Sequence, residues 1–269
     1  MGISAYMTET KPLAVVTGAS SGIGFELARV FADNGFDILI NAENGRLGAA
    51  ADQLRAAGAR VEPVQADLST YDGVEHLYAA IVSTGRPVSA AALNAGVGRG
   101  GAFIDTGLAD DIKIIDLNVT STVHLAKRLL KDMVARNDGK LLIASSIAAT
   151  IPGSFQAVYN ASKSFLQSFA EALQTELKDA NVTITSLMPG PTDTDFFHRA
   201  GMDGTRVGEA QKDDPAQVAK QGFDALMNGE GKLIAGSAKT KAQGIASKVL
   251  PDSLKAAAHR RMAEPGSGK

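Results

Sequence analysis

The amino-acid sequence predicts a single α/β domain built on a doubly wound parallel sheet with helices on both faces. Short apolar runs alternate with longer stretches in which apolar residues recur every three or four positions, which is the pattern of repeated β-α-β units. The short runs are apolar on both faces, as buried parallel strands are. A chain of 269 residues with 45% hydrophobic content is long enough to bury its core in one domain.

The order of these segments defines the predicted elements. The apolar runs predict strands at 13–17, 37–41, 60–66, 88–94, 140–145, 182–188 and 232–236. Helical periodicity fills 22–34, 46–57, 72–83, 108–136, 157–180 and 215–227, and several of these stretches end in Gly or Asn, as helices do. Right-handed crossovers between such strands give a Rossmann-like sheet. We therefore expect ligands beyond the carboxyl ends of the strands, where the strand order reverses.

Composition excludes several classes of function. A formal net charge of -2 does not supply the basic face that a nucleic-acid partner needs. The chain has no cysteine, which excludes disulfides and thiolate sites, and its four histidines are too scattered to predict a metal site. No secretory signal and no membrane-spanning apolar run is recognisable. We expect a cytoplasmic protein that acts on small molecules, without a metal, nucleic acid or membrane.

The stretch VVTGASSGIGFELARVFADNG, residues 15 to 35, fits two motifs. Gly18, Ser20 and Gly22 match the nucleophile elbow of a serine hydrolase, whereas Gly18, Gly22 and Gly24 match a turn that admits a dinucleotide pyrophosphate. Both motifs need a strand, a tight turn and a helix. A hydrolase also needs an acid and then a histidine later in the chain, and the available histidines lie in helical stretches or lack an acid partner. The dinucleotide interpretation is therefore favoured.

Further residues at strand ends support a dinucleotide site. The amides and the positive dipole end of the first helix favour a pyrophosphate, and the next strand ends offer groups for the adenine ring and the ribose. An isolated Asp or Asn-Gly is more often a turn former, so these signals are weak individually. The residues predicted to bind the dinucleotide are Thr17, Gly18, Ser20, Ser21, Gly22, Ile23, Gly24, Asp67, Leu68, Asn94, Ala95 and Gly96.

A tyrosine and a lysine four residues apart give the strongest chemical signal. Tyr159 and Lys163 share one face of the helix predicted at 157–180, so their side chains come within reach of each other. A free phenol has a pKa of about 10, and a nearby ammonium moves that pKa toward the range where acid-base catalysis is effective. Ser146, which follows the strand at 140–145, is placed to bind a substrate carbonyl. A surface Tyr and Lys pair is the alternative, but the added serine and glycine turn disfavour it.

These motifs resemble those of one enzyme family. TGASSGIG, NAG, Ser146, YNASK and Pro189-Gly190 occur in the order and approximate spacing of the short-chain dehydrogenases/reductases, over residues 13 to about 195. The resemblance implies a subunit that binds NAD(P)(H), with Tyr159 as the acid-base and Lys163 lowering its pKa while holding the nicotinamide ribose. It implies that Ser146 orients the substrate, that Asn118 completes a tetrad by holding a water, and that subunits form homodimers or homotetramers. It also implies that Pro189, Gly190, Thr192 and Thr194 contact the cofactor.

The cofactor preference is set where this chain departs from the family pattern. Ala42 occupies the position where the family carries aspartate for NAD, and Glu43 the position where it carries arginine for NADP. Ser21 also replaces the basic residue of many NADP-dependent members. Because a carboxylate repels a 2′-phosphate, we expect Glu43 to favour NAD(H), although Arg46 can swing in to bind NADP. Leu93 replaces the first asparagine of the family's NNAG motif, and the ending after residue 210 is not recognisable.

The expected function is reversible hydride transfer between a nicotinamide cofactor and a ketone, aldehyde or secondary alcohol, with Tyr159 as general acid or base. A catalytically silent NAD(P)-binding sensor or scaffold is the alternative. We expect residues 1–12 to be an N-terminal leader, 13–238 the catalytic domain and 239–269 a helical extension with a frayed tail. Within 191–212 we expect a substrate lid, whose residues Phe196, Phe197 and Met202 either cover an apolar ligand or anchor the loop.

Overall fold

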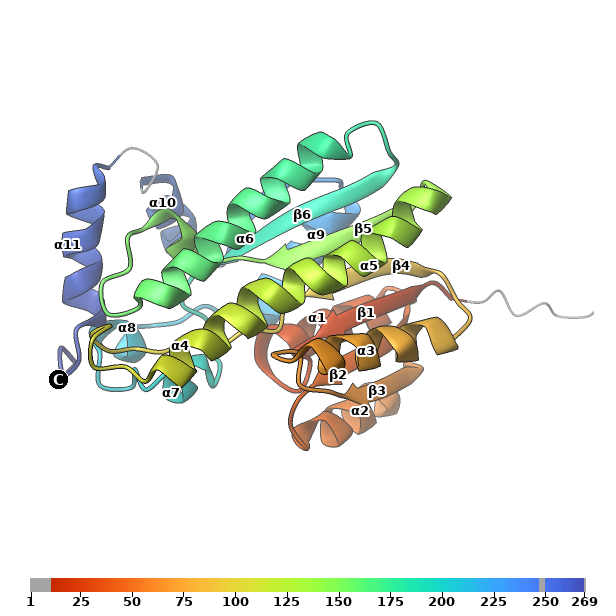
Figure 1. Cartoon of the computed structure of the whole chain (residues 1–269), viewed down its shortest axis with the longest axis horizontal. Helices are drawn as coiled ribbons and strands as arrows, with labels where there is room; N and C mark the ends of the chain where they lie inside the picture. Colours follow the sequence, from red (N-terminus) through yellow and green to blue (C-terminus); the bar gives the residue numbers. More distant parts are fainter. Residues whose placement is uncertain (1–10, 247–249, 269) are drawn as a thin grey trace, which may run out of the picture.

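A computed structural model describes residues 11–246 and 250–268 and contains a seven-stranded parallel sheet (Figure 1). The strand order is β3-β2-β1-β4-β5-β6-β7, which confirms the doubly wound, Rossmann-like prediction. The strands are β1 (Leu13–Thr17), β2 (Asp37–Ala42), β3 (Val61–Gln65), β4 (Val88–Leu93), β5 (Gly139–Ala144), β6 (Val182–Pro189) and β7 (Lys232–Ala235).

Helices cover both faces of the sheet and bury a separate apolar cluster on each. On one face, apolar side chains of α1 (Gly22–Asp33), α2 (Arg46–Ala56) and α9 (Pro215–Met227) pack against the strands. On the other face, which is turned toward the viewer in Figure 1, the strands are covered by α3 (Tyr71–Ser83), α5 (Ser121–Arg136) and α6 (Ala157–Glu176). Strands buried on both sides explain the continuous apolar runs in the sequence.

The strand order reverses between β1 and β4, and a small hydrogen-bond network joins these two strand ends. The hydroxyl of Thr17 accepts the backbone N–H groups of Asn94 and Ala95, each at 3.0 Å. The side-chain amide of Asn94 donates to the carbonyl of Thr17 at 3.1 Å. A crevice opens beyond the strands at such a point because the flanking connections run in opposite directions. Thr17 therefore holds the ends of β1 and β4 together at the crevice.

Most predicted boundaries lie within one residue of those in the structure, and the clearest differences concern two helices. The stretch 108–136 is not a single α-helix: α4 (Leu108–Ile114) leads into the π-helical η1 (Ile115–Thr120) and then into α5. A short π-helical segment occurs inside an otherwise α-helical stretch, so the helical periodicity of the flanking residues does not reveal it. The helix predicted to reach residue 180 ends at Glu176, and the strand predicted to reach 145 ends at Ala144.

The segments that follow β6 and β7 gather at the carboxyl end of the sheet. They comprise the short helices α7 (Phe196–Arg199) and α8 (Arg206–Glu209), together with α10 (Ala238–Ala246) and α11 (Asp252–Ala263). Helix α11 packs against α8 (Figure 1). The tail that we expected to be frayed is hydrogen-bonded to this region, since Gly268 donates to the Gly204 carbonyl at 3.0 Å. Of the predicted leader, residues 1–10 lie outside the described residues.

Two further features of the described ranges bear on function. None of their helices has the length and apolar character that crossing a membrane requires. The same ranges contain no group of three or more His, Cys, Asp or Glu side chains arranged to hold a metal ion.

Candidate active site

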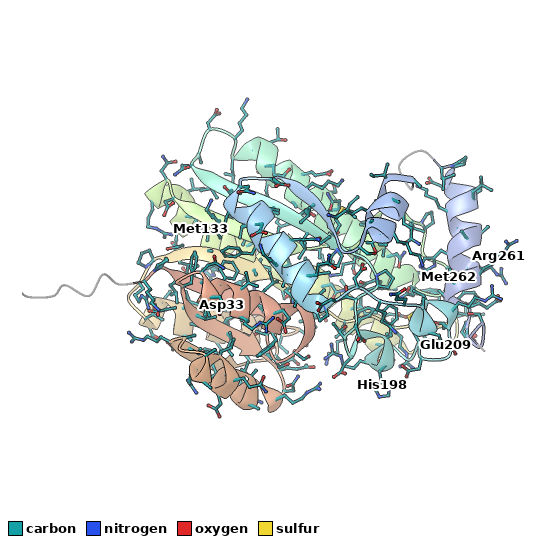
Figure 2. All side chains as sticks on the ribbon, turned by 180° about the vertical axis from the view of Figure 1, so that it is seen from behind. Asp33, Met133, His198, Glu209, Arg261 and Met262 are labelled. Carbon is teal, nitrogen blue, oxygen red and sulfur yellow. The ribbon has the colours of Figure 1, made fainter. Side chains whose placement is uncertain are left out.

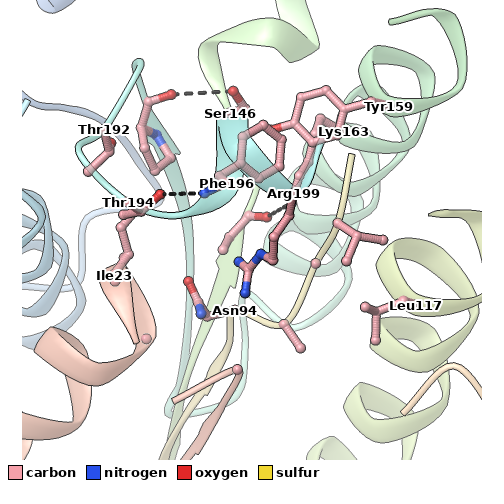
Figure 3. Close-up of a pocket in the computed structure, with 18 of the residues that line it drawn as sticks. Ile23, Asn94, Leu117, Ser146, Tyr159, Lys163, Thr192, Thr194, Phe196 and Arg199 are labelled. Atoms are coloured by element: carbon pink, nitrogen blue, oxygen red, sulfur yellow. Dashed lines mark hydrogen bonds between the residues drawn. The ribbon is translucent and has the colours of Figure 1, made fainter. Parts of the chain in front are cut away.

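A cavity of about 290 Å³ lies at the carboxyl ends of the strands and brings most of the predicted site residues together (Figure 3). Two predicted residues, Thr17 and Asn118, are buried behind its wall and do not line it. The predicted residues that do line it are Gly18, Ser20, Ser21, Gly22, Ile23, Gly24, Glu43, Asp67, Leu68, Asn94, Ala95, Gly96, Ser146, Tyr159, Lys163, Pro189, Gly190, Thr192 and Thr194.

The glycine turn between β1 and α1 has the geometry of an anion site. Gly18 and Gly22 adopt left-handed conformations, with φ of 66° and 58°, which side chains disfavour. A Cβ on Gly18 would lie 2.9 Å from the Cα of Ala95, so the turn also needs glycine for space. The first residues of α1 receive no side-chain cap from Ser21 and include no acid. Their N–H groups are therefore open to a pyrophosphate, and the turn fits that group.

Acceptor oxygens after β2 and β3 also line the cavity. The carboxylate of Asp67 accepts the backbone N–H of Ser69 at 2.9 Å and its hydroxyl at 2.7 Å. Burial raises the pKa of Asp67, but these hydrogen bonds and the charge of Lys113 outweigh it and hold the pKa below its usual value. Glu43 also lines the cavity and pairs with Lys113 at 3.3 Å. Carboxylates in this position suit the hydroxyls of an adenosine ribose.

Ser146 and Tyr159 meet at the centre of the cavity. Ser146 caps the short 3-10 helix η2 (Ile147–Thr150), where its hydroxyl accepts the N–H of Ala148 at 3.1 Å. The same hydroxyl donates to the carbonyl of Pro189 at 3.3 Å, as the dashed line in Figure 3 shows. It also shares a hydrogen bond with the Tyr159 hydroxyl. The end of β5 and the first turn of α6 thus bring two hydroxyl groups to one point.

Lys163 lies at the base of the cavity and is anchored there. Its Nζ atom donates to the Ala144 carbonyl at 2.8 Å, and a Cβ on Gly96 would lie 3.4 Å from it. The Nζ atom is 5.9 Å from the centroid of the Tyr159 ring, which confirms that the two side chains share a helix face. Burial lowers the pKa of Lys163 to about 8, because the ammonium loses hydration.

The Tyr159 phenol differs from the sequence expectation. Burial raises its pKa to about 12, and the hydrogen bond with Ser146 offsets part of that rise. The lowering expected from Lys163 is not seen in this structure, because the Nζ atom is directed to the Ala144 carbonyl and desolvation disfavours the phenolate. The phenol is therefore protonated at neutral pH and holds a proton that it can donate.

Asn118 lies in the π-helical segment η1 and is completely buried. Its side-chain oxygen accepts the N–H of Val97 at 2.9 Å, and its amide donates to the Val97 carbonyl and to the Ser162 hydroxyl, each at 2.9 Å. These bonds join the loop after β4 to α6 behind Tyr159 and Lys163. Single π-turns often occur at functional sites. The water-holding role that the resemblance implies stays a prediction.

The predicted lid residues divide between the two roles considered for them. The Phe196 ring lines the cavity, and its centroid lies 5.1 Å from that of the Tyr159 ring. Met202 is completely buried, away from the cavity, in a cluster with Phe197, Ala200 and Ala263. Phe197 both lines the cavity and packs in that cluster. Phe196 therefore lines the cavity, as a covering residue would, whereas Met202 packs the loop against neighbouring residues.

Several cavity-lining residues were missed from the sequence. Gln156 precedes α6 and His259 belongs to α11, far along the chain from every motif. No local pattern marks these positions, because tertiary packing alone brings them to the cavity. The missed residues that line it include Ser145, Gln156 and His259, whereas Arg199 and Val207 lie in the predicted substrate lid at 191–212.

The hydrolase alternative lacks its catalytic partners. The Ser20 hydroxyl accepts a hydrogen bond from the side-chain amide of Asn44 at 3.2 Å. No histidine in the described ranges is hydrogen-bonded to it: His124 pairs with Glu75, and His198 pairs with Asp203. Ser20 thus has no base to activate it.

Comparison with known proteins agrees with this geometry. The family model described as short chain dehydrogenase matches residues 12–203. Dehydrogenase/reductase SDR family member 7B of Rattus norvegicus is 33% identical over 227 residues, which cover 80% of this chain and 70% of that protein.

Two solved structures are similar along nearly the whole chain. A short-chain dehydrogenase/reductase from Burkholderia phymatum in complex with NAD matches with a TM-score of 0.80 and 24% identity, covering 88% of this chain and 91% of that one. A short-chain dehydrogenase from Sphingobium yanoikuyae in complex with NADPH matches with a TM-score of 0.76 and 26% identity, covering 89% and 96%. The first similarity supports the fold. The two solved structures contain NAD and NADPH, respectively.

Proposed function

Since the chain belongs to the short-chain dehydrogenase/reductase family of NAD(P)-dependent oxidoreductases, we propose that it interconverts a carbonyl compound and an alcohol with Tyr159 as general acid or base. The substrate class is a ketone, an aldehyde or the corresponding secondary alcohol. The observation that carries this proposal is the convergence of Ser146, Tyr159 and Lys163 on one cavity that also contains the glycine turn.

A bound nicotinamide supplies or accepts the hydride. In the reducing direction, the hydroxyls of Ser146 and Tyr159 donate hydrogen bonds to the substrate carbonyl oxygen, and Tyr159 gives its proton as negative charge develops there. The Ser146 hydroxyl accepts from Ala148, so its own hydrogen is available to reorient from Pro189 to the substrate. A preorganised donor of this kind stabilises the transition state by a few kcal/mol.

Lys163 and Asn118 support the proton transfer. The Lys163 Nζ atom lies 5.9 Å from the centroid of the Tyr159 ring, which is close enough for the ammonium to favour the phenolate once the proton has left. With a pKa of about 8, it exchanges protons readily near neutral pH. Asn118 holds the Val97 loop against α6, and we assign to it the water that connects Lys163 to solvent.

We also propose a preference for NAD(H). The support is the pair of carboxylates at the adenosine end, Glu43 and Asp67, which would repel a 2′-phosphate. Two cations could compensate, and both are engaged: Arg46 is hydrogen-bonded to Asp195 at 2.7 Å, and Lys113 pairs with Glu43 at 3.3 Å. The ratio of kcat/KM for NADH to that for NADPH measures this preference, and a ratio below one contradicts it.

A homo-oligomer and a cytoplasmic location are part of the proposal. Exposed apolar side chains on α4, η1 and α6 support an interface between subunits. They are Leu108, Ile112, Ile115 and Phe165. Light scattering after size-exclusion chromatography measures the subunit number, and a monomer at micromolar concentration contradicts the interface.

The experiment that tests the reaction is an assay of purified protein with NADH or NADPH against a panel of ketones and aldehydes, followed by nicotinamide absorbance. Turnover of some members is expected. Tight cofactor binding without turnover of any ketone, aldehyde or secondary alcohol supports the silent sensor instead. Hydrolysis of ester substrates without cofactor would favour the serine hydrolase.

A further inference from the structure

The C-terminal helix α11 closes one side of the cavity. Its Lys255 side chain donates to the Thr150 carbonyl at 3.0 Å, and the guanidinium of Arg260 lies 5.7 Å from the centroid of the Phe155 ring. The Ala263 side chain is buried against Phe197 and Met202 of the lid. Figure 1 shows α11 crossing the carboxyl end of the molecule beside α8. The helix is thus attached both to the loop after β5 and to the lid.

One side chain of α11, that of His259, lines the same cavity as Ser146 and Tyr159. Its Nδ1 atom lies 3.0 Å from the carbonyl oxygen of Ser154. A carbonyl oxygen can accept but not donate, so Nδ1 carries a hydrogen. The Nε2 atom forms no hydrogen bond with the residues that the structure describes. The ring is therefore fixed by one nitrogen while the other is free for a ligand.

The state of the ring defines what that free nitrogen can bind. Burial lowers the pKa of His259, although the Ser154 carbonyl opposes part of the shift. A neutral ring protonated at Nδ1 has an acceptor at Nε2. Lys255 and Arg260 are paired with Asp252 and Glu264 at 2.6 Å and 3.5 Å, so they add little net charge here. Arg199 lines the cavity together with His259, and its charge disfavours an ammonium group as the donor. The matching donor is a neutral hydroxyl.

We propose that His259 is a specificity-determining residue that accepts a hydrogen bond from a hydroxyl group of the substrate, remote from the carbonyl that reacts at Tyr159. This inference rests on the proposed function and narrows its substrates to hydroxy ketones, hydroxy aldehydes and the corresponding diols. It also gives the C-terminal extension a role, because α11 carries the nitrogen that binds the remote hydroxyl of the substrate. A site that accepts a hydrogen bond from a substrate hydroxyl favours substrates that carry this group over analogues that lack it.

Two substitutions of His259 test the roles of its two ring nitrogens separately. The amide nitrogen of asparagine in His259→Asn can take the place of Nδ1 and keep the bond to Ser154, whereas the group at Nε2 is lost. His259→Gln places an amide group near the position of Nε2. The exposed His198 on α7, whose side chain is 82% exposed and projects from the molecule in Figure 2, provides the matched control His198→Asn.

The test uses the full-length protein and methyl ketones that carry a terminal hydroxyl at increasing distance, each compared with the alkyl ketone of equal length. For the chain length that reaches His259, wild type should favour the hydroxy ketone in kcat/KM. His259→Asn should lower that preference roughly three- to tenfold, the effect of one lost hydrogen bond. His259→Gln should retain more of it, and His198→Asn all of it.

An unchanged preference in His259→Asn at every chain length would overturn the inference while leaving the reaction intact. Absence of turnover with every ketone would instead contradict the proposed function. In that case the dissociation constants of the same ketones for the protein-cofactor complex, measured by calorimetry, still decide the role of His259. Equal affinities of wild type and His259→Asn for each hydroxy ketone would exclude it.

Discussion

Tyr159 and Lys163 illustrate how a residue's chemistry depends on its surroundings as well as on its spacing. Their separation of four positions places both on one face of α6, and the distance of 5.9 Å from Nζ to the ring centroid follows from it. Burial then moves the two pKa values in opposite directions, upward for the phenol and downward for the ammonium. Both shifts favour the neutral form, as desolvation does. The site thus holds a protonated phenol beside a lysine that titrates near neutral pH.

Replacing Tyr159 with phenylalanine tests the acid-base role directly. Tyr159→Phe removes the proton donor but keeps the ring that packs against Phe196. We expect kcat to fall on the order of 10²- to 10⁴-fold, the usual contribution of a general acid, with NADH affinity preserved in fluorescence titrations. Tyr78→Phe, on α3 beside Asp132, is the matched control and should keep wild-type turnover. Near-normal turnover in Tyr159→Phe would exclude this mechanism.

The pKa of about 8 for Lys163 predicts a pH dependence. Burial lowers it from 10.5, so the lysine carries its proton below about pH 8 and loses it as the pH rises. Because the lysine cation returns a proton to Tyr159 after each turnover, kcat/KM for ketone reduction should fall above about pH 8. In Lys163→Arg the side chain stays protonated above pH 8, because a guanidinium has a pKa of about 12 or higher. The pH profile of kcat/KM for this variant, scaled to its own maximum, should therefore stay flat above pH 8. The same fall in both proteins would contradict the assignment.

Among the elements, the loop after β6 is connected to the start of α2. Arg46 at the start of α2 pairs with Asp195 at 2.7 Å, and the two side chains are 54% and 49% exposed. This hydrogen bond holds the pKa of the Asp195 carboxyl below its usual range. An exposed pair adds little stability. We expect its effect to be on position, because a guanidinium bound to Asp195 is not available to a cofactor 2′-phosphate.

Releasing Arg46 should therefore change the cofactor preference. In Asp195→Asn, we expect kcat/KM for NADPH relative to NADH to rise roughly three- to tenfold, the effect of one hydrogen bond to a charged group. Thermal stability should change little. The control is Asp193→Asn, since Asp193 is an exposed carboxylate two residues earlier in the same loop. An unchanged ratio in Asp195→Asn would show that Arg46 does not reach the phosphate.

At the scale of the whole molecule, two apolar clusters join the helical layers to the sheet. Phe31 of α1 is completely buried in the second cluster, and its ring meets those of Phe36 and Phe223 edge to face, with centroids 5.2 Å and 5.1 Å apart. Phe223 belongs to α9, which follows residues 191–212 in the chain. The contact therefore connects the glycine-turn helix to the segment after these residues.

Truncating this side chain should destabilise the entire domain. Phe31→Ala creates a cavity between α1 and α9 and should lower the free energy of unfolding by about 3 to 5 kcal/mol, measured by urea denaturation. Phe103→Ala, at a side chain that is 62% exposed, should cost less than about 1 kcal/mol. Equal losses in the two variants would mean that the aromatic cluster does not hold the helical layer in place.

The sequence by itself determined the sheet, most element boundaries and nineteen of the predicted residues around the cavity. It could do so because strand ends of a parallel sheet meet at one edge, and because spacings such as that of Tyr159 and Lys163 act within one element. The resemblance to the family supplied the remaining positions, among them Glu43, Pro189 and Thr194. Tertiary structure alone decided the direction of the Tyr159 pKa, the π-helical turn at Asn118 and the arrival of His259 from α11. Desolvation and packing between distant segments produce these features, and no local pattern encodes them.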